Sequence, residues 1–291
     1  MRMDIKGTLI PIGGNEDKGI EELEIYTLEF IQEGILSRVV AEAGGNDATI
    51  VVIPTASQIP VEVSKNYLKA FGTLGCDNVH IMDIRDREDS IKPENLELMR
   101  RADCVMFSGG NQSLITRKIG DTELHDIIMD KYQNTNFVVA GTSAGAMCMS
   151  KEMITGGSAK ESFVKGAVGL GQGMSFIPSL IIDSHFIRRG RFGRLAESVS
   201  TFPNLLGVGL AEDTGLVIKK GKTIEVIGSG MVIIFDPRKM SHNNLSLIGS
   251  GDNLSIANMR THVLSNGDIF NIKKRKLKIL PADIHVVSAQ D

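Results

Sequence analysis

Long apolar segments, paired cysteines and a strong net charge are all missing from this sequence. Its longest apolar runs, such as Thr49–Pro54 and Phe137–Ala140, are far shorter than the roughly 18 residues that a transmembrane helix needs. No apolar run of signal-peptide length precedes the first glycine-rich turn. We therefore expect no membrane association and no export, and we predict a cytoplasmic location.

The few cysteines and the small net charge exclude further classes. Cys76, Cys104 and Cys148 are odd in number and lack C-x-x-C spacing, which argues against a disulfide framework and a zinc site. We expect these side chains to be buried and reduced, and we expect no metal. A net charge of −3 provides no global field for nucleic acid, so no such partner is expected and any role for basic residues must come from a local cluster.

The remaining composition is typical of a globular α/β protein. Hydrophobic residues make up 42% of the chain, and its 291 residues can bury a sizeable core as a single domain over residues 1–291. Short β-branched runs predict strands at Thr8–Ile12, Thr49–Ile53, Val79–Met82, Cys104–Phe107, Phe137–Ala140 and Leu180–Asp183.

Most of these predicted strands are continuous apolar runs, as expected where helices cover both faces of a mostly parallel sheet. Helical patterns at Glu21–Ala43 and Thr122–Tyr132 lie between them. From about Gly215 onward, short strands alternate with Gly, Asn and Asp turns, which predicts antiparallel additions at the sheet edge.

Ligands of such sheets bind beyond the carboxyl ends of the strands, so the turns at those ends are candidate sites. They read PIGGNEDKG (11–19), PTAS (54–57), SGGNQ (108–112), GTSAGA (141–146) and DSHF (183–186).

The segment Gly141–Gly145 matches G-x-S-x-G, a turn that raises a nucleophilic serine where a strand passes into a helix. The apolar FVVA precedes it and a helix-compatible stretch follows, so Ser143 is the candidate nucleophile. The two glycines permit a strained turn, and the N–H of Ala144 can stabilise an oxyanion. The alternative is a tight turn with a purely structural role.

A serine needs a base, and His185 is the best placed of the six histidines because it follows a predicted strand end. A structural histidine at a strand end is the alternative. Two carboxylates compete to orient this base, Glu161 in a glycine-rich segment and Glu212 after a probable strand. Spacing does not choose between them, and either can be a solvated surface residue.

Two further segments are candidates for contacts with a substrate. In SGGNQ, Gly110 can bring a second backbone N–H to an oxyanion and Gln112 can orient a substrate, although an ordinary Gly-Gly turn is the alternative. Four arginines follow His185 within seven residues, namely Arg188, Arg189, Arg191 and Arg194. Because arginine binds carboxylates in a planar fork, they suggest an anionic substrate; a solvated basic face and phosphate binding are the alternatives.

Taken together, GGNEDK (13–18), PTAS, SGGNQ, GTSAGA and DSHFIRRGRFGRL (183–195) resemble the cyanophycinases, in the same order along the chain. This branch of the serine peptidases includes the alpha-aspartyl dipeptidase called peptidase E. The resemblance implies a doubly wound fold related to class I glutamine amidotransferases, usually dimeric. It also implies cleavage of cyanophycin, an aspartate backbone with arginine on each β-carboxyl, to β-Asp-Arg dipeptides without a metal or cofactor.

By the same resemblance, Ser143 is the nucleophile, His185 the base and Glu161 the acid, with Glu212 in reserve. The substrate pocket is expected to contain Gln112, Asp183, Ser184, Arg189, Arg191 and Arg194. One position departs from the family, because Ser184 stands where cyanophycinases commonly have glutamine.

Three other functions remain open. A peptidase E-like dipeptidase, or another small acyl hydrolase, would share the serine turn but not the pocket. An α/β-hydrolase would place its base later in the chain, at His262 or His285. A binding protein of the same fold would need no catalytic serine at all.

Overall fold

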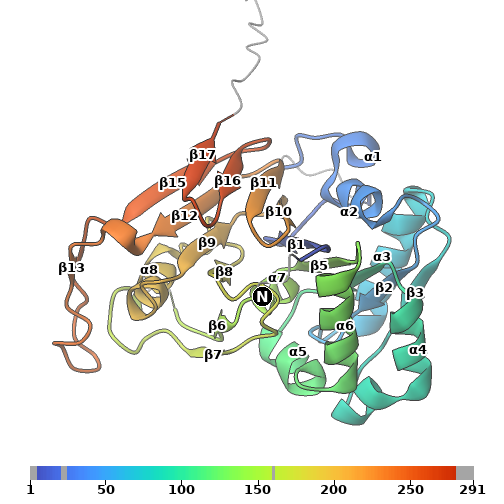
Figure 1. Cartoon of the computed structure of the whole chain (residues 1–291), viewed down its shortest axis with the longest axis horizontal. Helices are drawn as coiled ribbons and strands as arrows, with labels where there is room; N and C mark the ends of the chain where they lie inside the picture. Colours follow the sequence, from blue (N-terminus) through green and yellow to red (C-terminus); the bar gives the residue numbers. More distant parts are fainter. Residues whose placement is uncertain (1–4, 21–24, 159–160, 280–291) are drawn as a thin grey trace, which may run out of the picture.

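The structure, a computed structural model, describes residues 5–20, 25–158 and 161–279. Two sheets lie side by side, and most helices surround the larger one (Figure 1). The larger sheet has nine strands in the order β17-β16-β11-β10-β1-β5-β4-β2-β3.

One half of this sheet is parallel and the other half is antiparallel. The parallel strands are β1 (Thr8–Ile12), β2 (Ile50–Ile53), β3 (Val79–Ile81), β4 (Cys104–Phe107) and β5 (Val138–Thr142). The antiparallel strands are β10 (Thr214–Lys219), β11 (Thr223–Gly228), β16 (Ile269–Asn271) and β17 (Lys276–Lys278).

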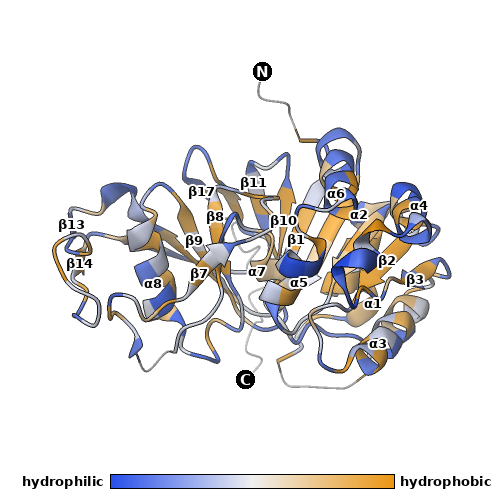
Figure 2. Cartoon of the chain, turned by 90° about the horizontal axis from the view of Figure 1, so that it is seen from below, coloured by the Kyte–Doolittle hydropathy of each residue, from blue (hydrophilic) through white to orange (hydrophobic). Residues whose placement is uncertain are grey.

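Helices cover both faces of the parallel half, which explains why β1, β2, β4 and β5 are buried along their whole length. On β2, Ile50 and Val52 pack with one set of helices while Val51 and Ile53 pack with the other, as the two-residue period of a strand requires. The first set is α1 (Phe30–Glu33), α2 (Ile35–Ala43) and α3 (Pro60–Thr73), and the second is α4 (Pro93–Arg101), α5 (Gln112–Ile119) and α6 (Glu123–Asn134). The apolar strands between these helices are visible in Figure 2.

The second sheet has the order β15-β12-β9-β8. Its strands are β8 (Leu180–Asp183), β9 (Leu206–Leu210), β12 (Val232–Asp236) and β15 (Arg260–Leu264), and α8 (Phe192–Thr201) covers one face. Leu180 and Ile182 belong to the main core, whereas Ile181 packs with Leu195 and Val199 of α8.

Short elements complete the described part of the chain. They are α7 (Ala144–Met147), the pairs β6 (Glu152–Ile154) with β7 (Leu170–Gln172) and β13 (His242–Asn243) with β14 (Ile256–Ala257), and two 3₁₀ turns, Arg87–Ile91 and Pro237–Lys239. Among the described residues, no helix is both long and apolar enough to cross a bilayer.

The predicted mixed α/β fold is confirmed, with one correction to its topology. Leu180–Asp183 is a strand as predicted, but it does not join the central sheet. Both edges of β5 are taken by β1 and β4, and antiparallel β10 takes the free edge of β1, so β8 pairs with β9 instead. The predicted helix Glu21–Ala43 is broken at Gly34 into α1 and α2, and its residues 21–24 lie outside the described part.

The three cysteines are buried, as expected. Cys104 and Cys148 are fully inaccessible and Cys76 is 3% exposed. Burial raises the pKa of all three thiols.

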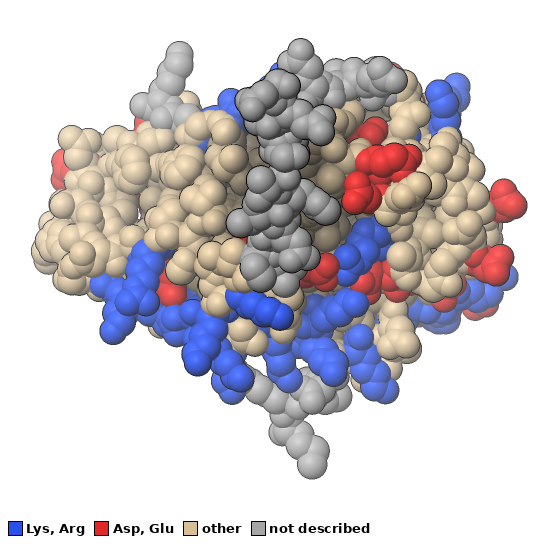
Figure 3. Space-filling model, turned by 90° about the horizontal axis from the view of Figure 1, so that it is seen from above, with Lys and Arg blue, Asp and Glu red and all other residues tan. Residues whose placement is uncertain are grey.

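Lysine and arginine side chains gather along one edge of the molecule (Figure 3). Two turns joined by a hydrogen bond from Ile272 N to the Lys222 carbonyl carry exposed lysines, namely Lys219, Lys220, Lys222, Lys273, Lys274 and Lys276. On β1, Thr8 pairs with Lys219 whereas Ile12 pairs with Thr142. These lysines therefore lie at the opposite end of the sheet from Ser143.

Candidate active site

Ser143 stands at the tip of a strained turn between β5 and α7. Its backbone has φ 50° and ψ −105°, a conformation that a non-glycine residue rarely adopts. Neither neighbouring glycine can be replaced without a clash, since a Cβ on Gly141 would lie 2.6 Å from the Gly145 carbonyl and one on Gly145 would lie 2.4 Å from the Phe107 carbonyl. Ser143 N donates to the Ile12 carbonyl at 2.8 Å, which ties the turn to β1. The geometry is that of a nucleophile elbow.

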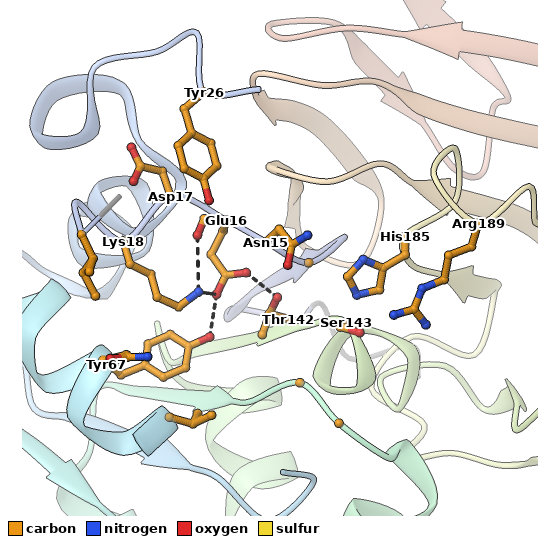
Figure 4. Close-up of a pocket in the computed structure, with 16 residues that line it drawn as sticks. Asn15, Glu16, Asp17, Lys18, Tyr26, Tyr67, Thr142, Ser143, His185 and Arg189 are labelled. Atoms are coloured by element: carbon orange, nitrogen blue, oxygen red, sulfur yellow. Dashed lines mark hydrogen bonds and ion pairs between the residues drawn. The ribbon is translucent and has the colours of Figure 1, made fainter. Parts of the chain in front are cut away.

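His185 and Glu212 meet beside this turn. Nδ1 of His185 lies 3.0 Å from Oε1 of Glu212, and the two side chains are 12% and 11% exposed. A carboxylate can only accept a hydrogen bond, so Nδ1 donates and Nε2 is left as the basic nitrogen. His185 and Ser143 line the same cavity, of about 530 Å³ (Figure 4).

The parallel pairing of β8 and β9 explains this contact. Asp183 is opposite Gly209, so the residues just beyond the two strand ends come together, His185 after one and Glu212 after the other. Glu161, by contrast, is exposed and lies in a turn, where its own backbone N–H donates to the Ser158 carbonyl. The structure therefore brings the reserve candidate Glu212, rather than the preferred Glu161, into contact with His185.

Burial lowers the pKa of His185 below 6.5, and the charges of Arg189 and Arg191 act in the same direction. The hydrogen bond and the charge of Glu212 raise it and partly offset this effect. The imidazole is therefore neutral at pH 7 and able to accept a proton.

Two glycines that follow β4 line the same cavity as Ser143. A Cβ on Gly109 would lie 3.5 Å from Ser143 Cβ, and both Gly109 and Gly110 line the cavity. Gly110 has φ +138°, and a Cβ there would lie 2.0 Å from the Ala56 carbonyl, so no other residue fits. No described residue accepts a hydrogen bond from the Gly109 or Gly110 amide. These amides, with that of Ala144 at the start of α7, are available for an oxyanion.

A buried carboxylate that the sequence analysis did not assign lies beneath the elbow. Glu16 is 1% exposed and accepts hydrogen bonds from Thr142 Oγ1 at 2.5 Å and Tyr67 Oη at 2.6 Å. Lys18 Nζ lies 2.9 Å from its Oε1. These contacts lower the pKa of Glu16 despite its burial, so it remains ionised and holds the residue that precedes Ser143 (Figure 4). The position of Glu16 within the GGNEDK motif was the sequence signal that could have identified it.

The arginine cluster does not act as one unit. Arg194 binds both carboxylate oxygens of Asp183, with Nε 2.6 Å from Oδ2, and Arg191 Nη1 lies 3.1 Å from Oδ1. Asp183 is inaccessible and Arg194 is 5% exposed. The lining of the cavity described by the structure includes neither Asp183 nor these two arginines, but it does include Arg189. Of the expected arginine contacts, the structure brings Arg189 alone to Ser143.

Two other predicted pocket residues are also engaged within the protein. Gln112 donates its amide N–H to the Ile154 carbonyl at 2.7 Å. Ser184 is inaccessible, with its Oγ 3.3 Å from Met147 Sδ and 3.5 Å from Ser143 Oγ. Neither lines the described part of the cavity. Within the described ranges, no group of three or more side chains is placed to hold a metal ion.

A model of peptidase family S51 matches residues 29–226. The chain belongs to peptidase family S51. The resemblance inferred from its motifs is thereby confirmed, and the chain is a serine-type peptidase.

Relatives of this S51 peptidase match over nearly its whole length. It is 34% identical over 284 residues to a cyanophycinase of Trichormus variabilis, covering 98% of this chain and 91% of that protein. It is 35% identical over 273 residues to a cyanophycinase of Geminocystis herdmanii, covering 94% and 96% of the two chains.

Two solved structures share the fold of this S51 peptidase. A peptidase from an acI-B1 actinobacterium has a TM-score of 0.65 at 19% identity, covering 92% of this chain and 98% of that one. A putative peptidase E protein from Listeria monocytogenes has a TM-score of 0.50 at 18% identity, covering 77% and 98%.

Glu212→Gln is expected to lower kcat by about 10³-fold or more, because an amide does not stabilise the imidazolium formed during attack. The acid limb of the kcat/KM profile should also shift to lower pH, since Glu212 raises the pKa of His185. Glu161→Gln is the matched control and should change kcat by no more than about twofold. Hydrolysis of a peptide substrate between about pH 4 and pH 8 measures both effects. A large loss in the Glu161 variant would restore that residue as the acid.

Glu16→Gln should lower kcat by about tenfold and leave KM within about twofold, because a small displacement of the elbow misplaces the nucleophile. Thr142→Val removes the same contact from the other side and should reproduce the effect. Tyr67→Phe removes a hydrogen bond that does not reach the elbow and should lower kcat less. If all three variants lost stability but kept kcat, Glu16 would have only a structural role.

Arg194→Ala should lower the free energy of unfolding by about 3 kcal/mol, because it leaves the buried Asp183 carboxylate without its bidentate partner. Arg188→Ala, on the exposed side of the same cluster, should change it by less than about 0.5 kcal/mol. Urea unfolding of the two variants tests this difference. Equal, small changes would show that the Asp183 pair contributes nothing to stability.

Proposed function

We propose that this S51 peptidase hydrolyses cyanophycin to β-Asp-Arg dipeptides through an acyl-enzyme on Ser143. The observation that carries the proposal is the guanidinium of Arg189, which lines the same cavity as Ser143 and His185 and pairs with none of the described residues. Each unit of the polymer carries the carboxylate of its arginine, and Arg189 is the charged partner for that group. The nearly full-length similarity to two cyanophycinases supports the same substrate.

The reaction begins when Ser143 Oγ attacks the carbonyl carbon of a backbone amide and His185 Nε2 takes the hydroxyl proton. Glu212 stabilises the resulting imidazolium through Nδ1. The amides of Gly110 and Ala144 stabilise the oxyanion. When the C–N bond breaks, His185 returns the proton to the leaving amine, and the rest of the substrate remains on Ser143 as an ester.

Water completes the cycle. His185 Nε2 takes a proton from a water molecule, whose oxygen attacks the ester carbonyl. The second tetrahedral intermediate uses the same two amides and collapses to a free carboxylate, while the proton passes from His185 to Ser143 Oγ. The site is then in its starting state.

The other residues that were predicted to line the substrate pocket support the site in this proposal without contacting the substrate. Asp183, Arg191 and Arg194 hold one another beneath His185, and Gln112 fixes the segment that contains Ile154. Ser184 lies inside the protein next to the nucleophile. From the family resemblance we also propose a homodimer, which sedimentation tests. From the sequence we propose a cytoplasmic location, which cell fractionation tests.

A peptidase E-like dipeptidase is the second candidate, favoured by Ser184 in place of the family's glutamine. Cyanophycin and an α-aspartyl dipeptide, offered separately, distinguish the two activities. β-Asp-Arg in the product mass spectrum supports the first, and cleavage of the dipeptide alone supports the second.

Ser143→Ala should abolish release of β-Asp-Arg, since loss of a serine nucleophile costs on the order of 10⁶ in kcat. Ser184→Ala removes a hydroxyl 3.5 Å away and should cost less than about tenfold. Product release by the two variants, with circular dichroism to verify folding, tests the assignment. Residual activity of Ser143→Ala above about 1% would overturn it.

A further inference from the structure

The four arginines that follow His185 form two pairs with different surroundings. Arg191 and Arg194 are bound to Asp183. Arg188 and Arg189 are exposed, and neither guanidinium makes a hydrogen bond or ion pair with any described residue. The second pair is therefore available to a ligand.

The two free arginines line different cavities. Arg189 lines the cavity that contains Ser143, whereas Arg188 lines a second one of about 790 Å³. Asn15 lines both cavities, so they lie on either side of this residue or next to each other at it. Glu212 forms part of the second wall, which places that cavity behind the proposed triad acid.

The second cavity combines one cation, Arg188, with apolar side chains, in addition to Glu212 and polar residues such as Thr27 and Ser229. Besides Arg188, its described lining includes Ile25, Ile187 and Met231, which are 43%, 42% and 41% exposed. An arginine branch has a matching composition, because its methylene stem can pack on apolar side chains while its carboxylate pairs with a guanidinium.

The geometry of an extended chain relates the two cavities. Successive side chains of such a chain point to opposite sides, so neighbouring branches of an aspartate backbone separate in the same way. Two cavities that share Asn15 in their linings, each with one arginine that no described residue engages, fit two neighbouring branches.

We propose that the second cavity binds the next unit of the polymer, with Arg188 paired to the carboxylate of its arginine branch. This inference rests on the proposed function and extends it: a substrate of two units fills the positions on either side of the scissile bond, and a third unit reaches Arg188. The peptidase therefore selects chains longer than two units.

Synthetic peptides of two and three β-Asp-Arg units test this selection. The initial rate of β-Asp-Arg release from each peptide is measured by mass spectrometry. In the wild-type protein, kcat/KM should be about fivefold higher for the longer peptide, the scale of one exposed ion pair. Arg188→Ala should reduce this ratio to about one, and Arg188→Lys should retain part of it.

Two controls separate the cavities. Arg189→Ala should lower kcat/KM for both peptides and preserve the ratio, because it acts on the first cavity. Met231→Trp, which fills the second cavity without removing a charge, should reduce the ratio as Arg188→Ala does.

Equal kcat/KM values for the two peptides in the wild-type protein, or an unchanged ratio in Arg188→Ala, would overturn the inference alone. If the wild-type protein cleaved neither these peptides nor cyanophycin, the proposed function would fail and the inference with it.

Discussion

The turn that follows β1 is bonded to each part of the candidate site. The Ile12 carbonyl accepts from Ser143 N, the Gly13 carbonyl from His185 N and the Gly14 carbonyl from Asp213 N, next to Glu212. A Cβ on Gly14 would lie 2.3 Å from the His185 ring, so the imidazole packs directly on this backbone. Ser143, His185 and Glu212 follow three different strands, β5, β8 and β9, and this short glycine segment sets their separation.

Much of this arrangement was predictable from sequence, because it depends on local signals. Apolar runs located the strands, and the glycines around Ser143 indicated the elbow. Long-range pairing was not predictable. Leu180–Asp183 has the composition of a central strand, and only the occupied edges of β1 and β5 exclude it from the central sheet. The same limitation applied to Glu161 and Glu212, since the choice depends on β8 lying parallel to β9.

The sequence also does not distinguish charged residues that are exposed from those that are buried in the fold. Arg188 and Arg194 look alike in a basic cluster, yet one is exposed and the other binds a buried carboxylate. Glu16 looks like a surface residue of a polar loop, yet it is enclosed by Tyr67, Thr142 and Lys18. Burial separates these cases, and burial is a property of the assembled fold. A sequence motif therefore locates a functional site, but it does not show which residues of the motif contact a ligand.

The enclosed cysteines have a practical consequence for work in solution. All three thiols are inaccessible or nearly so, and their raised pKa values keep them protonated at neutral pH. A cysteine introduced at an exposed position such as Lys220 would then react with maleimide reagents far faster than the native thiols. A fluorophore or spin label can thus be attached at one chosen point without first replacing Cys148, which lies just beyond the nucleophile turn.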